Sequence, residues 1–341
     1  MESSTIIMTE ESTRIRNYLT KEGAEHFDDI YFKRKLGATA NIRSLGGMYK
    51  DVAAQGARRG SESSKVIDEI LDITAFFRRL RGDSSVAIAT AMDILTGDIE
   101  KFRTYPIGET AAYIEKVNEA YEEEASSWEK VIKNYAYEII KDKNSMLLYD
   151  YSSLVGDVIK EASRENHVMD LYIPESRFLN GGLPFVRDGI QGKHRVHFFP
   201  DAAIMYYMKK ADLAMMGAET FLPNGDMINT IGSELVGIAC RRYEKPLYIP
   251  TTLIKVDYRA TYGIRRKELF RDLKDKMSEG WEIKLKDEVD FACPNLDIVP
   301  PENITAYITE RGVIPPAALF SECRSYVGDL RNKIYNRINY R

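Results

Sequence analysis

A change of pattern near residue 142 is the feature that most constrains how this chain folds. Before it, apolar residues recur every third or fourth position over 64–80, 86–95 and 107–137, which is the spacing of amphipathic helices. After it, short apolar runs alternate with helical segments, a pattern typical of a parallel, doubly wound sheet. We therefore expect an α/β protein with a helical N-terminal domain over residues 1–142 and a Rossmann-like domain over 143–341.

The expected elements of the second domain follow from these runs. Strands are predicted at 146–149, 168–173, 197–199, 213–216, 247–249 and 306–309. Helices are predicted at 154–162, 202–209 and 228–243, and the charged segment 255–290 is expected to be a surface excursion with one helix over 267–277. In the first domain, Asp83, Ser84 and Ser85 are expected to cap the helix over 86–95.

Composition excludes several classes of protein. The 48 basic and 52 acidic residues give a net charge of −4, so no overall basic field favours direct binding of nucleic acid. The apolar stretches are too short for a membrane-spanning helix, and the N-terminus lacks the pattern of a secretory signal. Three widely spaced cysteines are typical of reduced thiols, so we expect a cytoplasmic protein.

Polar residues follow the predicted strands at the points where each strand ends. In parallel sheets these carboxyl ends share one edge, and ligands bind there. The rule brings together two carboxylates, Asp150 and Glu219, with the guanidinium of Arg177 and several helix N-termini. Backbone N–H groups at a helix N-terminus together with an arginine favour an anion, so the sequence predicts a ligand that carries phosphate.

The common cofactor and nucleophile motifs do not occur in the sequence. It contains no GxxxxGK[ST] loop, no GxGxxG after a strand, no HExxH and no GxSxG. His194 and His197 lie three residues apart, and we interpret them as one exposed histidine and one at the edge of the core. We therefore expect no cofactor and no metal ion.

The order of longer motifs resembles one superfamily. Residues 217–233 resemble "GA(D/E) … NG … (I/A)NKIGT", residues 295–302 and 308–316 resemble "FDVTPPE … ITERGIIPP", and residues 175–177 resemble "TESRP". These motifs belong to the regulatory subunits of translation initiation factor 2B, to methylthioribose-1-phosphate isomerase and to ribose-1,5-bisphosphate isomerase. The resemblance implies a helical domain, a Rossmann-like domain and a homodimer formed through the latter.

The resemblance also implies where a ligand binds. The isomerases have a cysteine after the first strand of the second domain and an aspartate in the "GAD" turn, and this chain has Asp150 and Glu219 there. Thr230 replaces the lysine of "NKIGT", and Gln55 replaces the arginine of the "RGA" phosphate turn. The residues expected to bind the ligand or its phosphate are Gly56, Ala57, Arg58, Ser152, Arg177, Asn229, Thr230 and Arg311.

Three functions remain open from the sequence. The one we favour is an aldose–ketose isomerase acting on a phosphorylated sugar, with Asp150 as base and Glu219 as acid. The second is a regulatory protein that, like the initiation-factor alpha subunit, lacks the cysteine and binds a sugar phosphate or nucleotide without catalysis. The third is a structural subunit with a vestigial pocket. For a dimer, residues 313–318 are the candidate interface, unless they cover the core of their own subunit.

Overall fold

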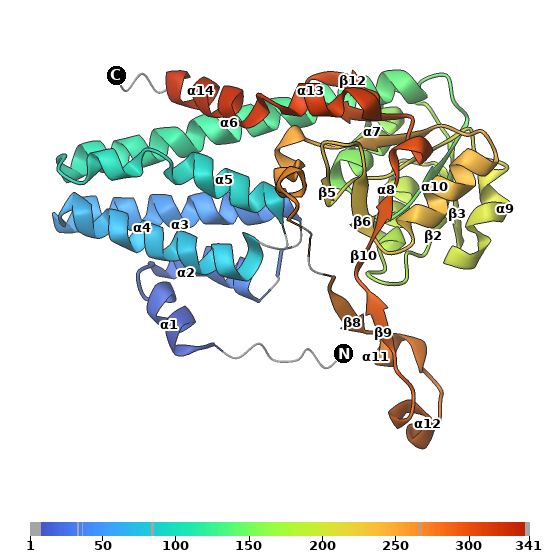
Figure 1. Cartoon of the computed structure of the whole chain (residues 1–341), viewed down its shortest axis with the longest axis horizontal. Helices are drawn as coiled ribbons and strands as arrows, with labels where there is room; N and C mark the ends of the chain where they lie inside the picture. The colour runs from blue at the N-terminus through green and yellow to red at the C-terminus, as the bar shows by residue number, and fades with distance from the viewer. Residues whose placement is uncertain are drawn as a thin grey trace. The chain divides into compact units, whose positions relative to one another are not determined.

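The computed structural model describes residues 8–32, 34–35, 37–82, 85–264, 266 and 268–337, which form two compact units. One unit comprises the chain up to Ser127 together with the segment from Ser325 onward, and the other is Trp128–Arg324. Figure 1 shows helices alone in the first unit and a helix-flanked sheet in the second. The fold class predicted from the sequence is therefore confirmed.

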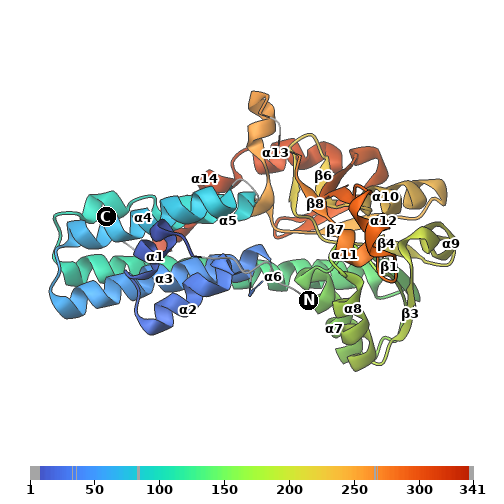
Figure 2. The same ribbon diagram turned by 90° about the horizontal axis from the view of Figure 1, so that it is seen from below.

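The first unit is a bundle in which α2, α3, α4 and α5 run side by side, as both Figure 1 and Figure 2 show. The helix predicted over 64–80 is present, and most of its apolar positions, such as Ile70 and Phe77, are buried, whereas Leu80 is exposed. Of the residues predicted to cap the next helix, Ser85 takes the N-cap position, whereas Asp83 and Ser84 lie outside the described residues. The helices are α1 (Glu10–Arg16), α2 (Lys21–Tyr31), α3 (Ala38–Arg59), α4 (Ser63–Phe77), α5 (Val86–Thr96), α6 (Ile107–Ile140), which continues into the second unit, and α14 (Tyr326–Arg337).

The second unit is built on a seven-stranded sheet in the order β12-β11-β7-β4-β1-β2-β3. Its neighbouring strands pair in parallel except β12, which returns antiparallel to β11 through a short turn. Apolar side chains in the central strands, such as Leu147 and Ala214, are completely buried. The strands are β1 (Ser145–Leu148), β2 (Asp170–Pro174), β3 (Arg195–Phe199), β4 (Leu213–Met215), β7 (Leu247–Pro250), β11 (Ala306–Thr309) and β12 (Gly312–Ile314).

The order of the strands reverses between β1 and β4. The chain passes from β1 to β2 and β3 through α7 (Ser153–Arg164) and α8 (Gly182–Gln191), which pack against each other. It then returns to β4 and passes outward to β7 through α10 (Ser233–Arg242), which packs against α9 (Ile204–Met208). In open α/β sheets, the crevice beyond the carboxyl ends of the strands at such a reversal is where ligands bind.

The helix predicted over 228–243 is wrong in its first part. Met227–Thr230 is a strand, β6, which pairs antiparallel with β5 (Thr220–Phe221) and with β10 (Leu296–Val299). The helix begins only at Ser233, after Gly232 takes a φ of +98°. A Cβ at Gly232 would lie 2.0 Å from the Tyr149 hydroxyl, so the position suits glycine on both counts. The strand's partner β10 is distant in sequence, which is why local spacing did not reveal it.

The predicted helix over 267–277 is also mostly wrong. Lys267 lies outside the described residues, and Phe270–Asp272 is a strand, β8, paired antiparallel with β9 (Ala292–Pro294). Helix α11 covers only Lys274–Met277 and is followed by α12 (Ile283–Asp287). Figure 1 shows these elements as an arm that extends away from the sheet. Among the described residues, no helix has both the length and the apolar character needed to cross a bilayer.

Candidate functional site

Asp150 lies directly beyond β1, at the reversal of strand order. Its Oδ2 accepts a hydrogen bond from the Thr230 hydroxyl over 2.7 Å, and its Oδ1 accepts a longer one from the Ser176 hydroxyl over 3.4 Å. Burial raises the pKa of the Asp150 carboxyl, and the negative charge of Glu219 raises it further, whereas the two hydroxyl donors lower it. A carboxyl with these neighbours is suited to exchanging a proton.

The backbone around this carboxyl is held in an uncommon conformation. Asp150 has a φ of +49° and Ser176, which contacts it, has a φ of +47°, both in the left-handed region. Non-glycine residues there cost free energy, and they concentrate at functional sites. Asp201, after β3, maintains the second of these turns because its carboxylate accepts the N–H groups of Ser176 and Arg177 over 2.8 and 3.1 Å. Three neighbouring strand ends thus cooperate to place Asp150.

Glu219 is the second member of what we call the carboxylate pair, Asp150 and Glu219. It lies on the turn between β4 and β5, is half-buried, and its N–H donates to the Ile228 carbonyl over 3.1 Å. The same turn passes close to the end of β1, because a Cβ at Gly217 would lie 2.6 Å from the Ser152 Cβ. The turn therefore brings Glu219 to the same reversal point as Asp150, where the two charges interact.

The two predicted residues on β6 have different roles. Thr230 is buried and donates to Asp150, whereas the buried amide of Asn229 donates to the Ser233 hydroxyl over 3.0 Å. Asn229, which precedes Thr230 in the chain, therefore holds the first residue of α10 in place. The structure brings Asp150, Ser152, Glu219 and Thr230 to one region.

Two of the three predicted phosphate-binding arginines, Arg177 and Arg311, belong to the second unit and are engaged elsewhere. The guanidinium of Arg177 pairs with Glu175 over 3.1 Å and is half exposed. Arg311, beyond β11, donates to the Glu322 carbonyl over 2.9 Å. Strands β4 and β7 separate β11 from β1 in the sheet. The cations expected from the sequence therefore do not contact the carboxylate pair in this structure.

Gly56, Ala57 and Arg58 belong to the other unit, in the last turns of α3. A Cβ at Gly56 would lie 2.3 Å from Val66 on α4, so this glycine permits close packing of the two helices. Gln55 is buried, and its amide donates to the Tyr18 carbonyl over 3.1 Å. Their participation in ligand binding stays a prediction.

Sequence reasoning missed Lys255 and Arg266 because both lie in what was expected to be a surface excursion. Burial lowers the pKa of each, and the nearby charge of Glu219 opposes that effect in both cases. Lys255 comes five residues after β7, so a closer look at that strand end could have found it. Arg266 had no comparable signal in the sequence.

A cavity of about 420 Å³ opens beside β6, β10 and the segment that contains Arg266. Its walls are mainly apolar, including Ile228, Leu269 and Ile298, with Arg266 and Asp297 among the polar residues. Neither member of the carboxylate pair lines it. Its size is within the range of small-molecule sites, and Arg266 connects its wall to the surroundings of Glu219.

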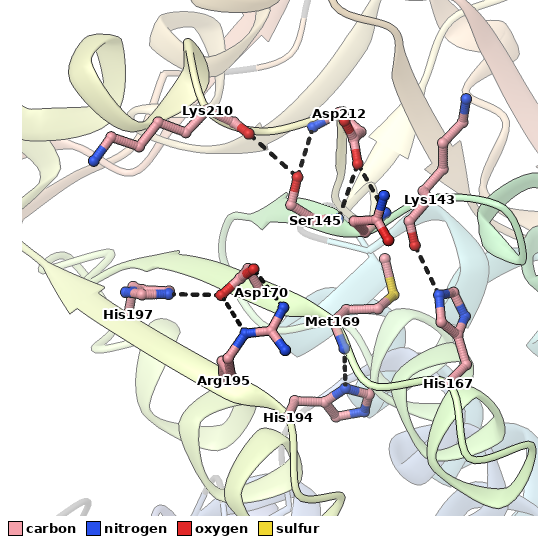
Figure 3. A network of polar contacts seen from close by, with 11 residues as sticks. Lys143, Ser145, His167, Met169, Asp170, His194, Arg195, His197, Lys210 and Asp212 are labelled. Carbon is pink, nitrogen blue, oxygen red and sulfur yellow. Dashed lines mark hydrogen bonds and ion pairs between the residues drawn. The ribbon is translucent and has the colours of Figure 1, made fainter.

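The four histidines offer no alternative centre. Figure 3 shows three of them, His167, His194 and His197, near the amino ends of β2 and β3, where His197 and Arg195 both bind the Asp170 carboxylate. His194 is buried and accepts the Met169 N–H over 3.2 Å. Within the described ranges, no group of three or more His, Cys, Asp and Glu side chains is placed to hold a metal ion.

The fold and the position of the half-buried Asp150 carboxyl define an α/β protein with a candidate small-molecule site at the switch point of a doubly wound sheet. The model of the Initiation factor 2 subunit family matches residues 45–316, and the chain belongs to this family. The family predicted from the sequence motifs is therefore confirmed.

Individual relatives include both functional types. Translation initiation factor eIF2B subunit alpha of Dictyostelium discoideum is 24% identical over 198 residues, which cover 56% of this chain and 61% of that protein. The chain thus spans less than two thirds of that relative's length. Ribose 1,5-bisphosphate isomerase of Thermococcus kodakarensis is 24% identical over 231 residues, 68% of this chain and 69% of that enzyme.

A solved structure, 5-methylthioribose 1-phosphate isomerase of Pyrococcus horikoshii, superposes with a TM-score of 0.76 at 19% identity and covers 92% of each chain. At that identity the likeness establishes the fold. The relatives support either an isomerase or a regulatory subunit, and the residues of the site must distinguish the two.

Proposed function

We propose that this protein is an aldose–ketose isomerase that acts on a phosphorylated, ribose-like sugar. The observation that carries the proposal is the half-buried Asp150 carboxyl, held by Thr230 and Ser176 in a strained turn and subject to the charge of Glu219. A second negative charge close by makes ionisation of Asp150 less favourable, which helps this carboxyl to carry a proton during the reaction.

The proposed reaction moves one proton between neighbouring carbons of the open-chain sugar. Asp150 removes the proton from the carbon next to the carbonyl and returns it to the former carbonyl carbon. Glu219, ionised at the start, takes the proton from the neighbouring hydroxyl and, then acting as the acid, gives it to the former carbonyl oxygen, so the overall proton balance is zero. A raised pKa makes Asp150 a stronger base once ionised, which suits removal of a carbon-bound proton.

The test compares D150N and E219Q with the unaltered protein. Conversion of pentose phosphates is followed by NMR, and each variant is expected to lose activity by about 10²-fold or more. Ligand affinity should stay within about tenfold, since these groups act mainly in the transition state. D170N, at the amino end of β2, is the matched control and should retain activity. Full activity in both site variants would refute the assignment.

A regulatory binder is the second candidate, and one observation favours it. The position of the motif lysine is occupied by Thr230, whose hydroxyl binds Asp150 and brings no positive charge. A binder would gain about 2.7 kcal/mol of stability at a ligand concentration of 100 Kd, without any turnover. A panel of pentose phosphates and nucleoside monophosphates, measured by thermal shift and NMR together, separates the two functions. A vestigial pocket would show neither response.

We also propose a homodimer formed through the second unit. Val313 and Phe320 are exposed apolar residues of the C-terminal segment, whereas Ile314 and Pro316 are buried in their own chain. The predicted interface over 313–318 is thus only partly available to a partner. Light scattering at micromolar concentration tests it, and a monomeric mass would refute the dimer.

The three free cysteines support our proposal of a reducing, cytoplasmic location.

A further inference from the structure

The arm formed by β8, β9, α11 and α12 contacts the loop between β2 and α8, residues 175–181, through Lys276 on α11. The Lys276 Nζ donates to the carbonyls of Arg177 and Phe178 over 3.1 and 2.9 Å. A third, longer contact of 3.5 Å joins the same Nζ to the Asn180 Oδ1. The arm is therefore tied back to a loop that follows one of the strand ends.

The ammonium of Lys276 is placed where a cation is costly. The side chain is half-buried, and both burial and the nearby charge of Arg271 lower its pKa. The Arg271 guanidinium itself lies 5.9 Å from the centroid of the Phe178 ring, so two cations of the arm approach the same loop. An ammonium has three N–H donors, and all three contacts of Lys276 go to neutral oxygens of this loop. The loop thus supplies the oxygens that offset the cost of burying the charge.

The same loop forms one wall around the Asp150 carboxyl. The Ser176 hydroxyl donates to Asp150 Oδ1 over 3.4 Å, and a Cβ at Gly181 would lie 2.2 Å from that oxygen. The loop also closes on itself, because the N–H groups of Leu179 and Gly181 both donate to the Ser176 carbonyl, over 3.3 and 3.2 Å. The shape of the loop therefore decides where the Ser176 hydroxyl lies relative to Asp150.

Two side chains of opposite charge hold the backbone of this loop. The Asp201 carboxylate accepts the N–H groups of Ser176 and Arg177, over 2.8 and 3.1 Å. Lys276 donates to the carbonyls of Arg177 and Phe178, so the N–H and the carbonyl of Arg177 are each held by a charged group. Ser176 has a φ of +47°, and such a strained backbone persists only where its surroundings fix it.

We infer that Lys276 is a positioning residue for Asp150, which acts through the loop between β2 and α8 by holding the Ser176 hydroxyl and Gly181 against the carboxyl. The inference rests on the proposed function, in which Asp150 is the base. It gives the arm, which carries neither member of the carboxylate pair, a part in the reaction.

A merely structural role for Lys276 would be to attach the arm to the sheet. Loss of its side chain would then lower the stability of the arm and leave the surroundings of Asp150 as they are. A positioning role predicts instead that the Ser176 hydroxyl moves away from Asp150. Because this hydroxyl lowers the pKa of Asp150, its loss makes the carboxyl harder to ionise. The titration of Asp150 therefore distinguishes the two roles.

The first experiment measures kcat and KM for conversion of pentose phosphates as a function of pH. K276M is expected to lose about tenfold or more in kcat while KM stays within about threefold, and the acidic limb of its pH profile should move to higher pH. K276R, which can also donate to carbonyl oxygens, should recover most of the loss, and K276Q should lie between K276M and the unaltered protein. Unchanged kcat and pH profile in K276M would overturn the inference.

The matched control is K274M. Lys274 lies on the same short helix and pairs with Asp287 of the arm over 2.7 Å, so its loss affects the arm without touching the loop between β2 and α8. K274M is expected to keep the kcat and the pH profile of the unaltered protein. Equal losses in K274M and K276M would show that general weakening of the arm is responsible, and would also overturn the inference.

The second experiment needs no turnover. The Asp150 carboxyl is titrated by ¹³C NMR in the unaltered protein, K276M and K274M, with D150N identifying its signal. The midpoint is expected to rise in K276M and to stay the same in K274M. An unchanged midpoint in K276M would overturn the inference even if the protein is an isomerase. A raised midpoint in K276M, together with an unaltered protein that converts no pentose phosphate, would support the positioning role and refute the proposed function.

Discussion

The Thr230 hydroxyl donates a hydrogen bond to Asp150 Oδ2 over 2.7 Å, which joins the small antiparallel sheet to the end of β1. In the motif that this chain resembles, the position of Thr230 is a lysine and the position of Asp150 is a cysteine. The two differences meet in one contact. A carboxylate in place of a thiol requires a donor, and the hydroxyl supplies one without introducing a buried charge.

Replacing Thr230 with valine tests this relationship. T230V keeps the shape and removes the donor, so the unfolding free energy at neutral pH is expected to fall by about 1 to 3 kcal/mol, because the bond is to a charged group. The same substitution in a D150N background should cost less, since a neutral amide needs the donor less. Urea unfolding of the four proteins gives the coupling. Equal costs in both backgrounds would contradict the contact.

Gly181 offers a steric test of how tightly the loop between β2 and α8 packs on the Asp150 carboxyl. A Cβ at Gly181 would lie 2.2 Å from Asp150 Oδ1 and 3.0 Å from the Asp150 Cα. G181A is therefore expected to displace the loop, cost about 1 to 3 kcal/mol and weaken ligand binding.

The matched control is G328A, on the exposed face of α14, where a Cβ would meet nothing within 4 Å. That change should be neutral or stabilise the helix by up to about 1 kcal/mol. Thermal unfolding measures both variants, and a G181A protein as stable as the original would show that the loop yields without cost.

Asp297 is expected to give a characteristic pH dependence. It accepts the N–H groups of Gly232 and Glu234 at the start of α10, over 2.8 and 3.2 Å, and its Oδ1 is buried without a hydrogen-bond partner among the described residues. Burial raises the pKa of Asp297 to about 6. A raised pKa means that ionisation destabilises the fold, so the penalty is absent below about pH 4, where unfolded aspartate is protonated.

The free-energy cost of ionising Asp297 in the folded protein grows between about pH 4 and 6 and stays constant above that range. D297N removes the charge and keeps an oxygen acceptor, so its stability relative to the unaltered protein should rise by about 2 to 3 kcal/mol across this window. Urea unfolding at a series of pH values measures the difference, with E138Q, at an exposed glutamate on α6, as control. A stability difference between D297N and the unaltered protein that does not vary with pH would show that ionisation of Asp297 does not destabilise the fold.

The sequence predicted the sheet well because each buried strand is a short apolar run, and helical segments between the runs require parallel crossovers. The rule that polar residues collect at strand ends selected Asp150 and Glu219, and the structure shows their charges interacting. That rule depends only on the fold, so it works whatever residues follow the strands.

The rest of the site depends on contacts between residues distant in the chain. Lys255 reaches the Ala218 carbonyl, next to Glu219 in the chain, only because Val256 bridges to Phe221 on β5, and β6 is a strand only because β10 returns to pair with it. Arg177 was expected to meet a ligand, but Glu175, two residues earlier, pairs with its guanidinium. Local spacing does not reveal the two long-range pairings, whereas the ion pair between Glu175 and Arg177, two residues apart, could have been anticipated from the sequence.

The last prediction concerns Asp170, the first residue of β2, which lies at the amino end of that strand, whereas the candidate site lies beyond the carboxyl ends (Figure 3 shows its contacts). Its carboxylate accepts hydrogen bonds from Arg195 over 2.6 and 2.8 Å and from His197 over 3.0 Å. The Arg195 guanidinium first, and His197 second, lower the pKa of Asp170 to about 2. A lowered pKa means that ionised Asp170 stabilises the fold above about pH 4, and that this contribution disappears as the pH falls toward 2.

Because Arg195 is 58% and His197 42% exposed, water screens these contacts, and D170N should cost only about 1 kcal/mol at pH 7. The cost should shrink as the pH approaches 3, in the opposite sense to the change expected for Asp297. Chemical unfolding of D170N and the unaltered protein at both pH values measures it, and turnover at neutral pH should be unaffected because the carboxylate lies at the amino end of β2. A cost that stays the same at low pH would mean that the amide disturbs packing rather than charge.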